Sequence, residues 1–157
     1  MIFYNFNDFI IKMSQRKQRT LIILKPEVLE RNIIGKILSY WDGHRFKLVA
    51  SKVLTGSDKQ FREHYEDVLE RITPEIGDGI IKRMTRGDCI FLVYEGDNII
   101  RETREFVGST DPTKANKNTI RAMYGESISY NVVHASDSDE NADKEIKLWF
   151  PELKYTI

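Results

Sequence analysis

Apolar and polar positions alternate along this chain with two different periods. Short continuous apolar runs predict buried strands, whereas apolar positions that recur every three to four residues predict helices with one buried face. The runs fall at residues 20–24, 89–94 and 131–134, and an imperfectly alternating stretch at 46–54 predicts one more strand. Helical spacing lies between them at residues 33–41, 57–65, 73–84, 97–107 and 138–150. Strands and helices therefore alternate, with a helical pair before the third strand.

Local signals mark several helix boundaries. Ser57 and Gln60 form a capping box, and Thr73 before Pro74 is an N-cap followed by proline at the first helical position. Asp97 is expected to cap the helix that follows it. The inward face of the helix at 73–84 is expected to hold Ile76, Ile80, Ile81 and Met84. The order predicts an α/β (α+β sandwich) fold: a ferredoxin-like β-α-β-β-α-β core with a four-stranded antiparallel sheet, added helices and a long polar loop at 108–117.

The 157 residues fit one domain, which we place at residues 18–157, preceded by an N-terminal extension at 1–17. Aromatic residues in the extension, such as Phe3 and Phe9, would be exposed unless they pack on a partner subunit. The other interpretation is a short leader or an upstream start, because Met13 is a second plausible start. The extension lacks the basic leading segment and small-residue cleavage site of a secretory signal.

Composition narrows the class of protein. Net charge is zero, so no general attraction to nucleic acid or to an anionic membrane is expected. No apolar stretch approaches the ~18 residues that span a bilayer, and a cytoplasmic protein is expected. Cys89 is the single cysteine, which excludes an internal disulfide, and its apolar surroundings predict a buried thiol.

His134 is the strongest candidate for chemistry. It ends an apolar run and is followed by Ser136 and Asp137, just before a predicted helix N-terminus. Imidazole can attack phosphorus, and helix N-termini favour phosphate. A strand-end histidine taken alone is nevertheless more often structural. His44 is expected in a solvated turn and His64 in a capping or surface role, and no second histidine or cysteine stands at the spacing of a zinc site.

Charged residues elsewhere could complete a phosphate site. Lys25 directly follows the first strand and is expected at a sheet edge, Arg104 lies in a predicted helix, and Arg121 lies in a polar connection. Guanidinium groups bind oxyanions bidentately, and ammonium acts as a point charge. Each of these residues, and Glu145 in the last helix, would singly be interpreted as a surface charge.

A set of motifs in a fixed order resembles the nucleoside diphosphate kinase family. The motif around the histidine is Asn131-Val132-Val133-His134-Ala135-Ser136-Asp137-Ser138, and the first strand reads Thr20-Leu21-Ile22-Ile23-Leu24-Lys25-Pro26. Further similar blocks are Arg31 to Gly35, His64-Tyr65, Tyr94-Glu95-Gly96, Gly108 to Pro112, Thr119-Ile120-Arg121 and Lys144 to Phe150. The resemblance extends from about Gln18 to Glu152.

The resemblance implies roles for these positions. His134 would accept the phosphoryl group, Glu145 would orient its ring, and Ser136 would hydrogen-bond near that carboxylate. The nucleotide's phosphates and ribose would be held by Lys25, Tyr65, Arg104, Thr110, Arg121 and Asn131. Mg²⁺ would be held mainly by the phosphates of ATP and other nucleotides and by water, with Asp137 as a contact through water. The implied reaction is ping-pong transfer of a terminal phosphate between nucleotides, in a homo-oligomer for which we favour a hexamer.

The sequence departs from the family pattern at several places. Ala135 replaces the usual glycine after the histidine, and Ala122 and Met123 follow Arg121 where the family usually has glycine and aspartate. The segment between Tyr65 and Met84 is longer than the common form. The family's base-stacking phenylalanine is best matched by Ile76, with Ile128 as the opposite wall, although a core role competes for Ile76.

Two other functions remain open from the sequence. A catalytically weak nucleotide-binding or scaffold protein of the same fold is one, and the presence of all the charged candidates disfavours it. A small regulatory module that binds amino acids or nucleic acid is the other. Neutral charge and the lack of an aromatic RNA-binding motif disfavour it, but the fold alone does not exclude it.

Overall fold

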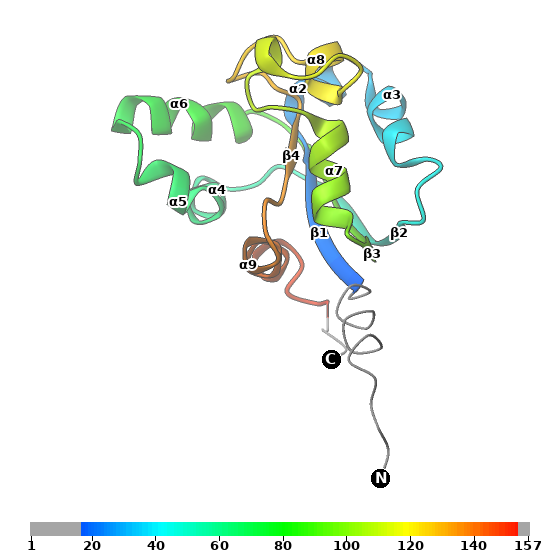
Figure 1. The fold of residues 1–157 in the computed structure, drawn as a ribbon. Coiled ribbons are helices and arrows are strands. Elements are labelled where there is room, and N and C mark those ends of the chain that lie inside the picture. The colour runs from blue at the N-terminus through cyan, green and yellow to red at the C-terminus, as the bar shows by residue number, and fades with distance from the viewer. Residues whose placement is uncertain (1–16, 154–157) are drawn as a thin grey trace.

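The computed structural model describes residues 17–153. Both interpretations of the N-terminal extension concern residues 1–16 and lie outside the described residues. The first strand begins at Lys17, one residue before the predicted start of the domain. Figure 1 shows the arrangement of the helices and strands.

The described residues form a sheet of four strands in the order β2-β3-β1-β4, and every neighbouring pair is antiparallel. The strands are β1 (Lys17–Leu24), β2 (Lys47–Leu54), β3 (Cys89–Asp97) and β4 (Val133–Ala135). The inner strands β1 and β3 are buried on both faces, which explains their continuous apolar runs, whereas the edge strand β2 alternates. The order and pairing confirm the predicted ferredoxin-like core with a four-stranded antiparallel sheet.

All five predicted helical segments are present in this part of the chain, which also holds three short helices that were not predicted. The predicted segments are α3 (Ile34–Leu38) with the 3₁₀ turn η1 (Ser39–Trp41), α4 (Asp58–His64), α6 (Pro74–Met84), α7 (Ile99–Val107) and α9 (Asp139–Trp149). The additional helices are α2 (Pro26–Glu30), α5 (Glu66–Leu69) and α8 (Ile120–Tyr124), and η2 (Pro112–Lys114) is a 3₁₀ turn in the long loop. Helices this short span less than two turns and leave no periodic signal. Within residues 17–153, none of the helices has the length and apolar character that crossing a membrane requires.

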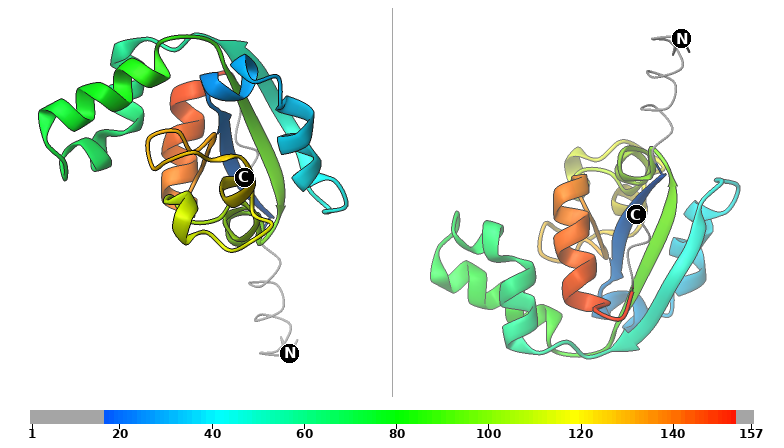
Figure 2. Two further views of the ribbon diagram at one scale, coloured as in Figure 1. Left: turned by 90° about the horizontal axis from the view of Figure 1, so that it is seen from above. Right: turned by 90° about the horizontal axis from the view of Figure 1, so that it is seen from below.

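The two faces of the sheet have separate cores, and β1 contributes to both. Ile22 and Leu24 pack with α2, α3, α7 and α8, whereas Leu21 and Ile23 pack with α4, α6 and α9. Figure 2 shows α9 and α3 on opposite sides of the sheet, with the lobe of α4, α5 and α6 projecting beyond α9. That lobe forms one wall of the site.

Two of the predicted helix N-caps are present, and one lies a residue further along the chain. The capping box of Ser57 and Gln60 is present, and Thr73 is the N-cap of α6, without a side-chain cap bond. The N-cap of α7 is Asn98 at φ 52°, not Asp97, which is the last residue of β3. Asparagine tolerates this left-handed conformation, so the strand runs one residue further than capping preferences indicate.

Candidate active site

A cavity of about 500 Å³ lies between the α4–α6 lobe, the end of the sheet and the segment before β4. The sequence-predicted residues that line it are Lys25, Tyr65, Ile76, Arg104, Thr110, Arg121, Ile128, Asn131, His134, Asp137 and Glu145. Ser136 is fully buried behind this lining. Residues more than a hundred positions apart therefore meet in one pocket, as the family resemblance implied.

His134 is held by a hydrogen bond from its ring to the last helix. It stands in β4 opposite Ile23, and its Nε2 lies 3.1 Å from Glu145 Oε2. The Ser136 hydroxyl donates to the same carboxylate oxygen at 2.6 Å and accepts the backbone N–H of Leu21 at 3.0 Å. A carboxylate accepts only, so the proton of the neutral imidazole sits on Nε2. The Nδ1 lone pair is then the nucleophilic one.

Glu145 stays ionised despite its burial. It is 9% exposed, and burial alone would raise its pKa. The electrostatic interaction with His134 and the hydrogen bond from its ring outweigh burial, with smaller effects from His64 and Ser136, and the net pKa is lowered. The local sequence contains no sign that this carboxylate is buried, because its neighbours in α9 are mostly polar.

His64 is a residue of the site, and not the surface or capping residue expected from the sequence. Its ring lies edge-to-face with that of His134, with the centroids 4.4 Å apart. Trp149 Nε1 donates to His64 Nδ1 at 3.2 Å, which places the proton of His64 on Nε2. Burial, with the electrostatic effect of a proton on the neighbouring His134, lowers the pKa of His64 to about 3, so this ring stays neutral.

His64, His134 and Glu145 each offer a ligand atom within 4.8 Å of the others, which is close enough to suggest a metal site. The tautomer of His64 argues against it, because Nε2 carries its proton and cannot coordinate. His64 stands next to Tyr65 in one of the quoted motifs, and that adjacency was the only signal for it.

Two cations face the cavity, Lys25, which is half-buried, and Arg121, which is buried. Lys25 Nζ donates to Asn131 Oδ1 at 2.6 Å, and burial lowers the pKa of Lys25 to about 8, with Glu27 opposing and Arg121 assisting the shift. Arg121 is 7% exposed and donates to the carbonyls of Gly108 and Val133. Its pKa falls to about 10, through burial and then the charge of Arg104. Cations that lower one another's pKa in this way favour the binding of an anionic ligand.

The structure corrects the predicted placement of Arg121 and agrees with that of Lys25. Arg121 lies in helix α8, whose N-cap Thr119 accepts from Ala122 N–H, and not in an irregular connection. Lys25 directly follows the inner strand β1, as predicted, and is also the N-cap of α2. In both cases an unpredicted short helix fixes the cation in the cavity.

Comparisons with known proteins agree with this geometry. The family model "Nucleoside diphosphate kinase" matches residues 18–155. The chain belongs to the nucleoside diphosphate kinase family. It is 40% identical over 141 residues to a nucleoside diphosphate kinase of Clostridium perfringens, covering 89% of this chain and 96% of that protein. For the enzyme of Nitrosospira multiformis the identity is 42% over 136 residues, covering 87% and 94%.

Nucleoside diphosphate kinase B of Mus musculus is 35% identical over 133 residues, with 85% of this chain and 86% of that protein covered. A solved structure supports the fold as well. The apo crystal structure of nucleoside diphosphate kinase from Encephalitozoon cuniculi matches with a TM-score of 0.80 and 32% identity, covering 85% of this chain and 88% of that one.

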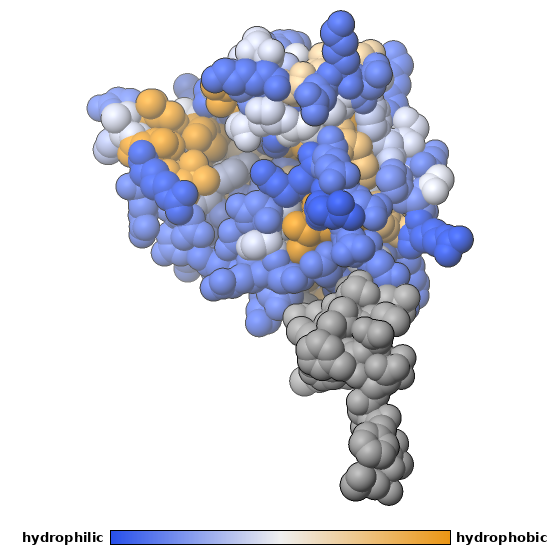
Figure 3. Space-filling model, viewed as in Figure 1, coloured by the Kyte–Doolittle hydropathy of each residue, from blue (hydrophilic) through white to orange (hydrophobic). Residues whose placement is uncertain are grey.

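Two departures from the nucleoside diphosphate kinase pattern, Ile76 and Ile128, lie at the mouth of the cavity. Ile76 is 55% exposed and Ile128 is 60% exposed, and both line the opening. Ile76 therefore points away from the core, unlike Ile81 and Met84 of the same helix, and the competing core role is wrong. Apolar side chains gather on the surface of the α5–α6 lobe (Figure 3), where Val68, Ile72 and Ile80 also line the cavity.

Asp137 lines the cavity without capping the last helix. Ser138 is the N-cap of α9, and the Asp137 carboxylate accepts from Asn141 Nδ2 at 2.7 Å. Ala135, in place of the family's usual glycine, is buried in β4 between His134 and Ser136 and pairs with Ile22. Alanine does not have a positive φ here, so the extra methyl group is accommodated.

Proposed function

We propose that this chain is a nucleoside diphosphate kinase, which transfers the terminal phosphate of ATP or another nucleoside triphosphate to a nucleoside diphosphate. The observation that carries the proposal is the hydrogen bond from His134 Nε2 to the buried Glu145, which leaves Nδ1 as the nucleophile in a cavity lined by cations. Nδ1 attacks the terminal phosphorus, the bond to the bridging oxygen breaks, and the diphosphate leaves. A second diphosphate then takes the phosphoryl group from His134 in the reverse step, which is ping-pong kinetics.

The remaining polar residues bind and orient the nucleotide. Phosphoryl transfer needs positioning and neutralisation of charge more than covalent work by the protein. We assign the phosphates and ribose to Lys25, Tyr65, Arg104, Thr110, Arg121 and Asn131, all of which line the cavity. Burial raises the pKa of Tyr65, so its hydroxyl remains a donor. Ile76 and Ile128 would hold a base by shape alone, which suits broad base specificity.

Mg²⁺ fits this cavity only as part of the substrate. The carboxylates that line it close to His134 are Glu145, which is committed to that ring, and Asp137. A divalent ion prefers oxygen ligands, so the nucleotide phosphates and water would supply most of them, with Asp137 reached through water. The bound ion would neutralise charge on the transferred phosphate.

We also propose a homo-oligomer, with a hexamer favoured, in the cytoplasm. The long loop from Gly108 to Arg121 is complete and ordered around η2 and α8, and in the family this loop contributes to trimer contacts. In the sheet formed by residues 17–153, β2 is an outer strand, and it carries the exposed Leu48 and Val53. The domain is proposed to span residues 18–157, with residues 1–17 as an extension that either precedes it as a leader or packs on a partner subunit.

Incubation with ATP and Mg²⁺ is expected to label the protein with an acid-labile, base-stable phosphate on His134. His134→Ala is expected to abolish both the label and phosphate exchange between ATP and a second diphosphate, because no other group among the described cavity residues is an aligned nucleophile. EDTA should prevent labelling of the parent protein. Equal labelling of His134→Ala and parent would contradict the mechanism. Binding of ADP by the parent without exchange would favour the scaffold alternative.

Affinity for ADP is expected to fall as pH rises through about 8, because Lys25 loses its proton there. The decline would approach tenfold per pH unit above that value. Calorimetric titration with ADP from about pH 7 to about pH 9.5 spans this titration. Lys25→Gln should bind weakly with a flat profile over the same range. A parent affinity that is constant across the range would disprove a role for the Lys25 ammonium.

The contribution of Lys25 to the free energy of unfolding should change with pH in the opposite direction from the affinity for ADP. The pKa of Lys25 is lower in the folded protein, at about 8, than its ordinary value of 10.5, which applies in the unfolded chain. Folding therefore disfavours the protonated form, and the contribution of Lys25 to the free energy of unfolding rises from pH 8 to 10.5. Bound phosphates reverse this effect by restoring the proton.

A further inference from the structure

A strained turn lies immediately before the histidine. Val132 has φ 64°, in the left-handed region that β-branched residues rarely adopt, and it is fully buried. Val133 N–H donates to the carbonyl of Asn131 at 2.8 Å, so the turn is a γ-turn centred on Val132. Asn131, which accepts a hydrogen bond from Lys25, directly precedes Val132, and His134 lies two residues after Val132. The conformation of one valine thus sets the positions of both.

Both backbone polar groups of Val132 are bound by the start of α2. Its carbonyl accepts Lys25 N–H at 3.0 Å, and its N–H donates to Glu27 Oε1 at 3.2 Å. Glu27 is 6% exposed, and among residues 17–153 only Glu27 and Glu145 are buried carboxylates. Glu145 orients His134, and Glu27 holds the turn that leads to it. A strained conformation persists only where its surroundings fix it.

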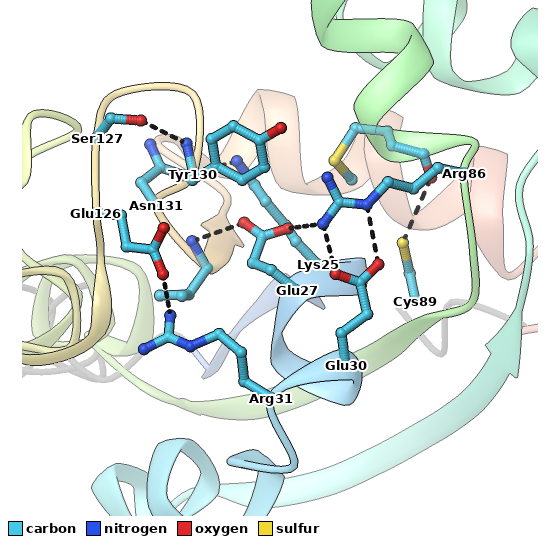
Figure 4. Close-up of polar contacts among 12 residues, drawn as sticks. Lys25, Glu27, Glu30, Arg31, Arg86, Cys89, Glu126, Ser127, Tyr130 and Asn131 are labelled. Carbon is cyan, nitrogen blue, oxygen red and sulfur yellow. Dashed lines mark hydrogen bonds and ion pairs between the residues drawn. The ribbon is translucent and has the colours of Figure 1, made fainter.

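The second oxygen of Glu27 faces a guanidinium that another residue already holds. Arg86 Nη2 lies 3.7 Å from Glu27 Oε2, whereas Arg86 makes two hydrogen bonds to the half-exposed Glu30, at 2.9 and 2.8 Å. Figure 4 shows Glu27 between Arg86 and the segment that carries Asn131. Arg86 therefore compensates the buried charge of Glu27 without competing for the oxygen that accepts Val132 N–H.

Glu27 also acts on the charge of Lys25. Burial lowers the pKa of Lys25, and Glu27 is the largest influence that raises it again. Arg121 and Arg83 lower it, and the Cys89 thiol, whose own pKa is raised to about 12 by burial, is neutral below that pH. His64, a further titratable group beside Lys25, is neutral at these pH values. A neutral side chain at position 27 would therefore leave Lys25 uncharged at a lower pH.

We propose that Glu27 is a positioning residue of the nucleotide site, which fixes the strained turn at Val132 and so places Asn131 and His134. The inference rests on the proposed function only for its kinetic test, because the turn and the binding of ADP are measured without turnover.

Glu27→Leu, which removes the acceptor of Val132 N–H at similar size, is expected to raise the KM for ADP about tenfold and to lower kcat. Glu27→Gln keeps an acceptor oxygen without charge. It should change kcat less than about threefold near neutral pH, while the fall in ADP affinity begins at a lower pH than in the parent. Glu30→Gln is the matched control, because Glu30 binds the same arginine but not the turn, and its KM, kcat and pH profile should equal those of the parent.

Amide hydrogen exchange gives a test that does not need a folded leucine variant. In the parent, the Val132 amide should exchange as slowly as those of β1 and at least about tenfold slower than that of the exposed Ser129. Three results would each overturn the role of Glu27. The first is fast exchange of the Val132 amide in the parent. The others are a folded Glu27→Leu variant with the KM and kcat of the parent, and a Glu27→Gln variant with the pH profile of the parent. If the Val132 amide of the parent exchanged slowly and the parent bound ADP without transferring phosphate, the proposed function would be wrong and the inference about Glu27 would stand.

Discussion

Replacing Glu145 by Gln is expected to slow phosphorylation of the protein by ATP about a hundredfold while ADP affinity changes little. The carboxylate only accepts hydrogen bonds, and it therefore fixes the proton of His134 on Nε2. A carboxamide can donate to Nε2 instead, which moves the proton to Nδ1 and removes the nucleophilic lone pair. Ser136 opposes this orientation, because its hydroxyl donates to the same oxygen that faces His134; the amide nitrogen can take that place when the hydroxyl donates instead to the Leu21 carbonyl, 3.4 Å away.

Rapid-quench measurement of the phosphorylated protein separates this step from nucleotide binding. Glu140→Gln, an exposed change in the same helix, is the control and should keep the parent rate. Ser136→Ala should have a smaller effect than Glu145→Gln, since it leaves the carboxylate in place. If Glu145→Gln were phosphorylated as fast as the parent, the tautomer of His134 would not limit the reaction.

Replacing Gly108 by Ala is expected to lower the free energy of unfolding by about 2–4 kcal/mol and to weaken ADP binding at least tenfold. Gly108 has φ 87° and ψ 176°, a region open almost only to glycine. A Cβ there would lie 2.8 Å from the Cβ of Thr119 and would also meet its hydroxyl oxygen. Thr119 caps α8, and the carbonyl of Gly108 accepts from Arg121, so the clash displaces a phosphate-binding cation.

Urea unfolding and calorimetry with ADP check both parts of this prediction. Gly35→Ala is a suitable control, because a Cβ at Gly35 would meet no atom within 4 Å and the residue is inside α3. That change should stabilise the protein by up to ~1 kcal/mol and leave binding intact. Parent-like stability and affinity in Gly108→Ala would show that the loop tolerates a different path.

The central sheet could be predicted from the sequence because burial differs between its strands. The buried strands β1 and β3 appear as continuous apolar runs, and the helical face of α7 is strongly periodic. The short helices α2, α5 and α8 could not be predicted, since one turn of helix has no period. The helical position of Arg121, one of the site's cations, was missed for that reason.

Residues of the candidate site could be predicted where they belong to a recognisable motif, but not where only packing brings them to the site. His134 and Glu145 came from ordered motifs, and the cavity brings them together. The role of His64 in the site depends on its contacts with Trp149 and His134, which are distant in sequence. The role of Glu27 depends on the backbone angle of Val132. Neither a tertiary ring contact nor a positive φ at valine leaves a mark on the local pattern.

Ser136 ties the chemistry to the centre of the sheet. Its N–H and hydroxyl oxygen are both bound by Leu21 of β1, and the same hydroxyl supports Glu145. Natural selection for folding and natural selection for activity therefore act on the same few bonds. A substitution near Leu21 that shifts β1 would be removed from a population for lost turnover even where the protein still folds, so this part of the strand should evolve as slowly as the histidine itself.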